Sequence, residues 1–435
     1  MSLIPRRAVR NIFPRLAAVV CLILFFAVPY GLAAGPSSQS PWVATWGTGM
    51  AAVDLGTAPD FSGKTLRQIV HVSVGGSQVR VWFSNRFGRV PLYVGSAHVA
   101  LTSTSSSATM PDGKKSVPDV SGIQPGSDHP LTFHHLDSIT IPPGAEIVSD
   151  PVAFNVPAFS NLSISIYLPE RTMATTAHPY ADQWSYAATG NLVSAANFAE
   201  HGRLMGQWFF LSGVDVYAPG DSAVVAFGDS ITDGYNSTID ANRRWPDVLA
   251  ERLAADPNTK QAGVLGVVNV GISGNRVLLD GYGPNAVSRI DPDVIARSGA
   301  RYVIVLESIN DITRYGSDHQ PYGDLAARLE TGIGQIAEQA HLHGMLVFGA
   351  TLTPYGECSC HTAEGEAIRA AVNQWIRTSH TLDGFVDFDK ATQDPQNPLR
   401  FAPQFDSGDH VHPNDAGYHA MANSIDLALF KLQRR

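Results

Sequence analysis

The stretch that decides the fold is AVVAFGDSITDG at residues 223–234. Its first five residues are apolar, which predicts a short buried strand, and glycines at 228 and 234 flank the turn that follows. A tight turn at the carboxyl end of a buried strand lies where α/β sheets hold their ligands. Ser230 in this turn is therefore a candidate nucleophile, although Gly-Asp-Ser is by itself also ordinary turn chemistry.

The rest of the carboxyl-terminal half alternates short apolar runs with longer segments of helical spacing. The predicted strands occupy residues 223–227, 264–270, 302–306, 345–350 and 385–387, and the predicted helices fall near 245–253, 323–342, 364–378 and 415–430. Alternation of strand and helix implies a parallel sheet with helices on both faces. We therefore expect a three-layer α/β domain over residues 221–435.

The amino-terminal half has a period of two instead. Apolar and polar residues alternate over 70–74 and again over 79–83, and Gly75-Gly76 between them predicts a hairpin turn. The polar Ser-, Pro- and Gly-rich stretch at 103–127 predicts an exposed loop. Because no long helical period appears here, we expect an antiparallel β-sandwich over residues 35–220 as an accessory domain.

Residues 1–34 have the layout of an export signal. Four arginines come first, at positions 6, 7, 10 and 15, followed by an apolar run at 16–29 and the small residues Gly31, Ala33 and Ala34. The apolar run is shorter than the roughly 20 residues that a membrane-spanning helix needs. We expect cleavage near Ala33 or Ala34, a secreted protein (extracellular or periplasmic), and no stable membrane anchor.

Composition limits the class of partner. A chain of 435 residues with 44% hydrophobic residues is long enough for two domains with their own cores. Its formal net charge of −9 argues against nucleic acid as a partner. We expect a small-molecule or carbohydrate ligand.

The mature chain keeps two cysteines, Cys358 and Cys360. In an oxidising compartment they either pair, in a tight and strained ring, or remain as two free thiols. A zinc site is a poor alternative, because His361 is the only further ligand nearby. We expect no metal and no cofactor.

Four polar segments follow predicted strands or precede the last helix. They are GDSITDG at 228–234, GISGN at 271–275, ESIND at 307–311 and GDHVHPND at 408–415. Since parallel strands deliver the loops after them to one edge of the sheet, these segments should meet there.

The residue types at that edge suit acyl transfer. A serine hydroxyl needs a base to take its proton, and His412 is the candidate base, with Asp409 three residues earlier to orient the imidazole. The candidate oxyanion-hole donors are the backbone N–H groups of Ser230 and Gly274 and the side-chain amide of Asn310.

Neighbouring polar residues have simpler interpretations. Ser273 lacks the G-x-S-x-G context of a nucleophile elbow, so we expect it to be structural. Asp229 and Asp233 flank the candidate nucleophile and are expected to cap or brace the turn. His410 forms an H-x-H pair with His412, but no ligand cluster beside it in the sequence completes a metal set.

GDSITDG, NVGISGN, ESIND and DHVHP occur in the order of the four blocks of the SGNH hydrolases, also called the GDSL esterase/lipase superfamily, and the chain resembles that family over residues 221–432. The resemblance implies a flavodoxin-like sheet and roles for Ser230, Gly274, Asn310 and His412, with Asp409 from the D-x-x-H pair. Further stretches resemble a secreted two-domain subgroup of arylesterases and carbohydrate acylhydrolases. The family usually has glycine where this chain has Ser308, so the loop that aims Asn310 is expected to differ.

These features predict a secreted serine esterase that forms an acyl-enzyme on Ser230 and acts on short-chain acyl, aryl or carbohydrate-linked esters. Two alternatives stay open at this stage. One is a carbohydrate- or surface-binding protein with a vestigial hydrolase domain, and the other is a lipase or lysophospholipase acting on longer acyl chains. Labelling by a serine-directed phosphonate would distinguish a serine esterase from the first alternative, and a panel of esters of increasing chain length would distinguish it from the second.

Overall fold

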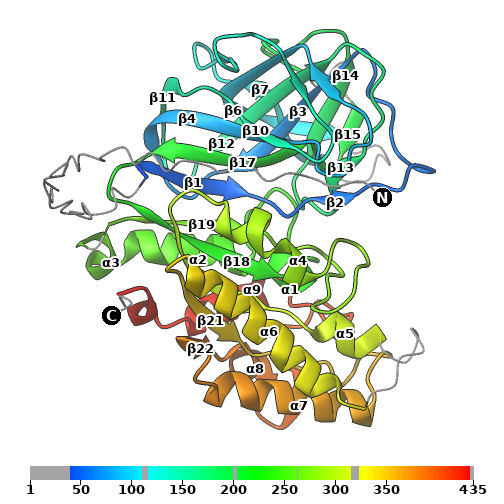
Figure 1. The fold of residues 1–435 in the computed structure, drawn as a ribbon, viewed down its shortest axis with the longest axis vertical. Coiled ribbons are helices and arrows are strands. Elements are labelled where there is room, and N and C mark those ends of the chain that lie inside the picture. Colours follow the sequence, from blue (N-terminus) through cyan, green and yellow to red (C-terminus); the bar gives the residue numbers. More distant parts are fainter. Residues whose placement is uncertain (1–39, 110–115, 199–202, 262, 315–322, 432–435) are drawn as a thin grey trace, which may run out of the picture. The chain divides into compact units, whose positions relative to one another are not determined.

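The sheet that carries Ser230 has five parallel strands in the computed structural model (Figure 1), which describes residues 40–109, 116–198, 203–261, 263–314 and 323–431. In spatial order the strands are β19 (Leu265–Asn269), β18 (Ser222–Gly228), β20 (Ala300–Leu306), β21 (Leu346–Ala350) and β22 (Gly384–Val386). All five lie where the apolar runs predict them. Every residue of β18 and β21 is buried, as expected for a sheet covered on both faces.

Strand order places the candidate nucleophile at the point where the chain reverses direction across the sheet. The chain runs from β18 outward to β19 and then returns to β20 on the other side of β18. At such a switch point the loops after the two adjacent strands separate and leave a crevice at their carboxyl ends. Ser230 follows β18 and the ESIND segment follows β20, so both border this crevice.

Two groups of helices cover the sheet. In the first group α2 (Trp245–Ala255) and α8 (Phe388–Thr392) contact α9 (Asp415–Ser424), and in the second α4 (Ala286–Ile290) and α7 (Ala363–Thr378) contact α6 (Leu325–Leu342). Shorter helical segments are α1 (Ser230–Asp233), α3 (Pro257–Gln261), α5 (Ile309–Arg314), the π-helix Asp291–Ile295 and the 3-10 helix Leu427–Lys431. This arrangement confirms the predicted α/β class for this half.

The amino-terminal half consists of antiparallel sheets, as predicted. One sheet has the order β1 (Trp42–Gly47), β17 (Leu211–Tyr217), β4 (Gly76–Ser84) and β10 (Glu146–Val148), with β11 (Val152–Val156) also on β4. The second has the order β15 (Arg203–Met205), β14 (Ser185–Thr189), β3 (Lys64–His71), β12 (Asn161–Leu168), β6 (Ser96–Thr109) and β7 (Ser116–Ile123), with β8 (His129–Leu131) on β6. A small third sheet has the order β16 (Trp208–Phe209), β13 (Thr176–His178) and β2 (Ala51–Ala52). In a fourth sheet, β5 (Leu92–Val94) pairs with β9 (Ile139–Ile141). The two remaining strands, β23 (Gln393–Asp394) and β24 (Asn397–Phe401), pair with each other in the carboxyl-terminal half.

Two local predictions in this half are wrong. The strands on either side of Gly75-Gly76 form no hairpin, because β3 and β4 belong to different sheets and the glycines carry the chain across. A Cβ at Gly75 would collide with the backbone of Val156, so only glycine allows this crossing. The polar stretch at 103–127 is not an exposed loop, because β6 and β7 pair along it up to Thr109 and Ser116. The hairpin prediction failed because alternation of apolar and polar residues identifies strands but not the strands with which they pair. The loop prediction failed because the backbone hydrogen bonds between paired strands do not require apolar side chains.

The two halves are joined by hydrogen bonds at the edge of the parallel sheet. Ala44 N–H donates to the Ser298 carbonyl at 2.8 Å, and Val267 N–H of β19 donates to Ser73 Oγ at 3.0 Å. Residues 39–435 form one compact unit, and the domain boundary at 220 stays a prediction. The predicted export signal lies outside the described residues.

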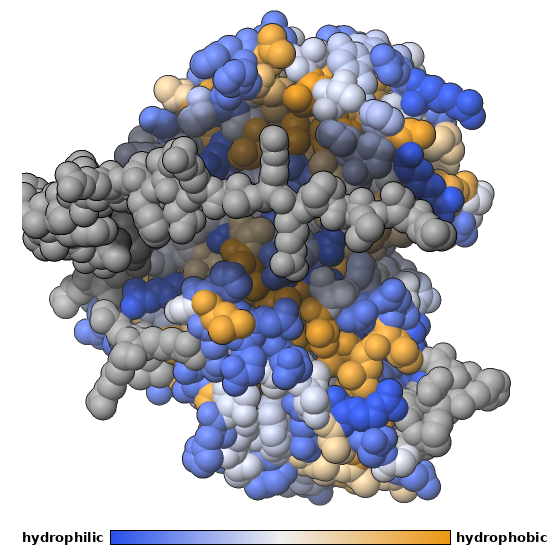
Figure 2. Space-filling view, viewed as in Figure 1, coloured by the Kyte–Doolittle hydropathy of each residue, from blue (hydrophilic) through white to orange (hydrophobic). Residues whose placement is uncertain are grey.

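The surface of the described residues is mainly hydrophilic. On the face in Figure 2, hydrophobic side chains form smaller groups between hydrophilic ones, as is usual for a protein surface. Within the described ranges, every helix is too short or too polar to span a bilayer.

Candidate active site

A short turn between β18 and α1 holds the candidate nucleophile. Asp229 caps α1 by accepting a hydrogen bond from Ile231 N–H at 3.0 Å, as predicted, and Gly234 ends the helix with a φ of +102°. A Cβ at Gly228 would lie 2.5 Å from the Leu306 carbonyl oxygen, so the close approach of β18 to β20 requires glycine there. These constraints fix the backbone on both sides of Ser230.

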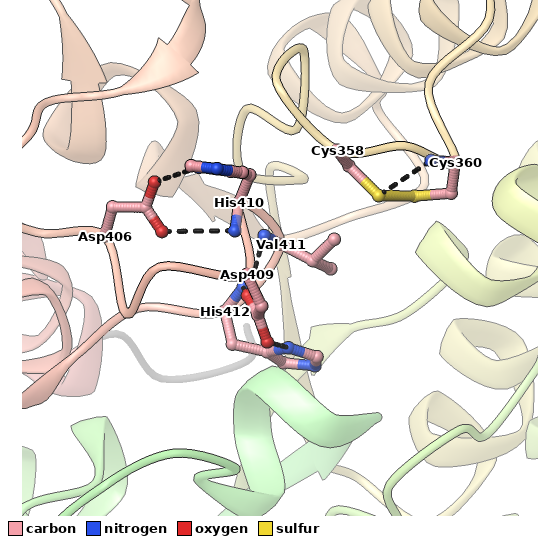
Figure 3. Close-up of a disulfide and its surroundings, with 7 residues drawn as sticks. All are labelled: Cys358, Cys360, Asp406, Asp409, His410, Val411 and His412. Carbon is pink, nitrogen blue, oxygen red and sulfur yellow. Dashed lines mark hydrogen bonds and ion pairs between the residues drawn. A yellow bond between two sulfur atoms is a disulfide. The ribbon is translucent and has the colours of Figure 1, made fainter.

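The structure brings the three predicted catalytic side chains together. Ser230 Oγ lies 2.7 Å from His412 Nε2, although the two residues are 182 positions apart in the chain. His412 Nδ1 lies 2.7 Å from Asp409 Oδ2, and Figure 3 shows how the loop folds back to make this contact. Serine, imidazole and carboxylate thus form a continuous hydrogen-bonded series, the arrangement that lets an imidazole accept a serine proton.

The environment of Asp409 keeps it ionised. Its Oδ1 accepts hydrogen bonds from the backbone N–H groups of Val411 at 3.0 Å and His412 at 2.8 Å. Partial burial opposes ionisation, but the hydrogen bonds and charge of His412 outweigh it and hold the pKa of Asp409 below its ordinary value. The carboxylate is therefore available to orient the imidazole throughout the neutral range.

The predicted oxyanion-hole residues border the same cleft as the triad. This cleft of about 300 Å³ is lined by Ser230, Gly274 and Asn310 together with His412 and Asp409. Gly274 has a φ of +80°, and a Cβ there would collide with the Tyr282 ring, so glycine is required by both conformation and space. Asn310 Nδ2 donates to the Asn275 carbonyl at 3.0 Å, which holds the amide beside the loop that carries Gly274.

Two buried aspartates brace the loop around Gly274. Asp311 accepts hydrogen bonds from Val277 N–H at 2.8 Å and Leu278 N–H at 3.1 Å. Asp233 Oδ2 accepts from both the backbone N–H and the hydroxyl of Ser273, at 2.9 and 2.6 Å. Ser273 is thus structural and Asp233 braces the turn, as the sequence predicts.

Ser308 occupies a backbone conformation that favours glycine. Its φ is +112°, outside the regions that residues with a side chain normally adopt. The side chain is fully buried, and its hydroxyl has no hydrogen-bond partner among the residues that the structure describes. The loop before Asn310 therefore keeps the backbone geometry expected for glycine despite the substitution.

Several residues of the cleft were not predicted from the sequence. Tyr180, Tyr235, Tyr282 and Arg314 complete its lining. The Tyr235 ring lies 4.8 Å from the His412 ring and 5.7 Å from that of Tyr180, which comes from the amino-terminal half between β13 and β14. Asn236, just after the GDSITDG motif, is a further missed residue, since its Nδ2 donates to Asp409 Oδ2 at 2.9 Å. In the sequence, only its position directly after this motif could have indicated that Asn236 belongs to the site.

Beside the triad loop lies a second polar group. His410 Nδ1 lies 2.5 Å from Asp406 Oδ2, as Figure 3 shows. Glu357, which the figure does not draw, joins them to form a set of potential ligand atoms within 4.8 Å of one another. Glu357 is distant from His410 in sequence and close in space, so the sequence around His410 did not indicate this group. Arg400 already pairs with Glu357 at 2.7 Å, so charge balance here does not require a metal ion.

Cys358 and Cys360, near the same loop, form a disulfide with an S–S distance of 2.02 Å. This settles the alternative that the sequence left open.

Buried carboxyl groups underlie the nucleophile turn. Burial raises the pKa of Asp311 to about 6 and also raises the pKa values of Asp229 and Glu307. Repulsion between Asp229 and Glu307 adds to this effect, while Arg289 opposes it at Glu307.

Fold and site together define a class: a parallel α/β sheet whose carboxyl edge presents a serine, a histidine and an aspartate in the geometry of an acyl hydrolase. Residues 226–420 match the GDSL-like Lipase/Acylhydrolase family, and over this segment the chain is similar to that family. It is accordingly a carboxylic ester hydrolase.

Solved structures with a similar fold include three esterase-related proteins. A putative lipolytic protein of the G-D-S-L family from Desulfitobacterium hafniense is 22% identical, with 48% of this chain and 99% of that chain covered and a TM-score of 0.36. An aryl esterase from M. smegmatis is 17% identical (46% and 95% covered, TM-score 0.36), and a carbohydrate acetylesterase family member from Sinorhizobium meliloti is 17% identical (48% and 100% covered, TM-score 0.38). No curated protein is a significant match to the chain.

Proposed function

We propose that the protein is a secreted serine esterase that hydrolyses short-chain acyl esters of aryl or carbohydrate alcohols through an acyl-enzyme on Ser230. The observation that carries the proposal is the 2.7 Å separation between Ser230 Oγ and His412 Nε2, with Asp409 on the opposite nitrogen of the ring. A hydroxyl in contact with an oriented imidazole is an activated nucleophile.

In the first half-reaction, Ser230 Oγ forms a bond to the ester carbonyl carbon while His412 Nε2 accepts the serine proton. The carbonyl π electrons move to oxygen, and the resulting oxyanion is stabilised by N–H donors of Ser230, Gly274 and Asn310, each worth roughly 2.7–4 kcal/mol. When the tetrahedral intermediate collapses, the bond between the carbonyl carbon and the alcohol oxygen breaks. His412 returns the proton to the departing alcohol.

In the second half-reaction, a water molecule attacks the acyl-enzyme and His412 takes the water proton. Collapse of this intermediate breaks the bond to Ser230 Oγ, which regains a proton from His412 and releases the carboxylic acid. Asp409 remains ionised throughout and stabilises the transient imidazolium.

Cleft dimensions and lining support the proposed substrate class. A volume of about 300 Å³ lies at the lower end of the range for small-molecule sites, which favours a short acyl chain. The rings of Tyr180 and Tyr282 are 41% and 52% exposed at this cleft, and such rings suit the flat face of an aryl group or a sugar.

The proposal is tested by replacing Ser230 with alanine. We expect the variant to lose turnover of p-nitrophenyl acetate and labelling by a serine-directed phosphonate, while its circular dichroism spectrum stays unchanged. A Ser96→Ala variant, altered on an exposed part of the sandwich, serves as the matched control and should keep full activity. Turnover retained by Ser230→Ala would overturn the assignment of the nucleophile.

Export is a separate part of the proposal and has its own test. When the full chain is expressed in a secreting bacterium, we expect the mature protein in the periplasm or medium, with an amino terminus just after Ala33 or Ala34. An uncleaved chain retained in the cytoplasm would contradict it.

A further inference from the structure

A buried polar contact joins the amino-terminal half to the loop that carries Gly274. His178 of β13 and Asp233 of α1 are both 2% exposed, and His178 Nε2 lies 2.9 Å from Asp233 Oδ1. The other carboxylate oxygen of Asp233 accepts both hydrogen bonds from Ser273, the residue before Gly274. One carboxylate therefore links an imidazole of the sandwich to an oxyanion-hole loop of the hydrolase half.

The surroundings of His178 define its protonation state. Its Nδ1 lies 2.9 Å from the Gly49 carbonyl oxygen, and its Nε2 faces the Tyr180 carbonyl oxygen at 3.0 Å as well as Asp233. Carbonyl and carboxylate oxygens only accept hydrogen bonds, so both ring nitrogens must donate. His178 is therefore an imidazolium, and Asp233 is its counter-ion.

Charges around this pair agree with that state. Burial alone would favour the neutral ring, but the charge and hydrogen bond of Asp233 outweigh it and raise the pKa of His178. Asp182, whose carboxylate would add to the attraction, and Arg244, which lines the same small cavity as His178 and Asp233, also face the pair. Asp229, Tyr180 and Tyr418 interact electrostatically with Asp233, and His71 and Asp247 line the same cavity. The Trp208 ring packs at 5.4 Å from the imidazole.

We infer that His178 is a positioning residue of the esterase, which holds the Gly274 loop in place through its ion pair with Asp233. The inference rests on the proposed function. Hydrogen-bond donors stabilise an oxyanion only if they are already aimed before the charge develops, so a brace two contacts away affects the transition state more than the bound substrate.

This assigns the sandwich a direct part in catalysis. His178 supports the Gly274 loop through Asp233, and Tyr180, two residues later, lines the cleft itself. Residues 178–180, at the end of β13, thus supply both a support for the loop and part of the lining of a site whose other proposed catalytic residues lie beyond residue 228.

The inference is tested with His178→Gln and Asp233→Asn, assayed with p-nitrophenyl acetate. Glutamine carries no charge, so the ion pair with Asp233 is lost. We expect each variant to lower kcat about 10-fold while KM changes less than about 2-fold, because only transition-state stabilisation is lost. The matched control is His98→Gln, which removes a histidine of the sandwich that pairs with Asp128 and should leave both constants unchanged.

A spectroscopic measurement covers the case in which these variants do not fold. In wild-type protein with ¹⁵N-labelled histidine, both ring nitrogens of His178 should carry a proton between pH 6 and 8. A neutral tautomer would overturn the inference. In addition, Ser273→Ala removes one hydrogen bond of the brace and should lower kcat about 3-fold.

Failure of this inference is distinguishable from failure of the proposed function. If Ser230→Ala stays active, the proposed function itself is wrong. If Ser230→Ala is inactive while folded His178→Gln keeps the wild-type kcat, only the positioning role is wrong.

Discussion

Asn236 Nδ2 donates to Asp409 Oδ2 at 2.9 Å, to the same oxygen that faces His412 Nδ1. The amide and the imidazole therefore share one carboxylate oxygen, and Asn236 restricts how far that carboxylate can rotate. The contact lies at an exposed edge of the site, where water can partly replace a lost donor.

Replacing Asn236 should accordingly have a moderate effect. We expect Asn236→Ala to lower kcat/KM about 3- to 10-fold for p-nitrophenyl acetate, because Asp409 loses one of its orienting donors. Asn236→Asp should lower kcat/KM further than Asn236→Ala, since a second negative charge would lie beside Asp409. Steady-state kinetics of the two variants check this ranking, and an Asp variant as active as wild type would contradict it.

The amide of Asn310 is expected to matter far more. In the proposed mechanism Asn310→Ala removes one of the three oxyanion donors, so kcat should fall about 100- to 1000-fold with a much smaller change in KM. Asn423→Ala, on the exposed side of α9, is a suitable control. An Asn310→Ala enzyme with near-normal kcat would show that the hole is formed by the backbone donors alone.

Ser308 should respond favourably to substitution by glycine. Glycine relieves the cost of a φ of +112° and removes a buried hydroxyl that lacks a partner, and these gains exceed the added flexibility of the unfolded chain. We expect Ser308→Gly to raise the free energy of unfolding by about 1 kcal/mol with activity retained. Ser308→Ala separates the two causes in the same urea titration, because it removes the hydroxyl and keeps the backbone strain. A less stable Ser308→Gly would contradict this account.

Asp182 makes stability depend on pH. Burial raises its pKa in the folded protein to about 7, well above the ordinary value for an aspartate. The folded state therefore binds this proton more tightly than the unfolded state, so the contribution to stability is present below pH 4 and is lost as pH rises to about 7.

Asp182→Asn should remove this dependence. We expect the variant to be more stable than wild type at pH 8 by about 4 kcal/mol, with little difference at pH 4, in urea unfolding followed by circular dichroism. Asparagine also tolerates the positive φ of 45° at this position, so the backbone is preserved. If the free energy of unfolding changed with pH in the same way in both proteins, Asp182 would be ruled out as a source of the pH dependence.

The elements that the sequence predicts well are those encoded by neighbouring residues. Strands β18 to β22 follow from short apolar runs, and the positions of Ser230, Gly274, Asn310 and His412 follow from motifs at strand ends. The prediction of a hairpin at Gly75-Gly76 is wrong because the two strands on either side, although adjacent in the chain, pair with strands of different sheets.

Sequence alone thus determined the class of each half and the chemical groups of the candidate site, because hydrophobic period and motif spacing are local properties of the chain. Tertiary structure alone decided which distant side chains support those groups. His178 and Tyr180 reach the site only because the sandwich packs against the parallel-sheet half, and Asn236 reaches Asp409 across 173 positions of the chain within the carboxyl-terminal half. Such contacts have no periodic signal in the sequence.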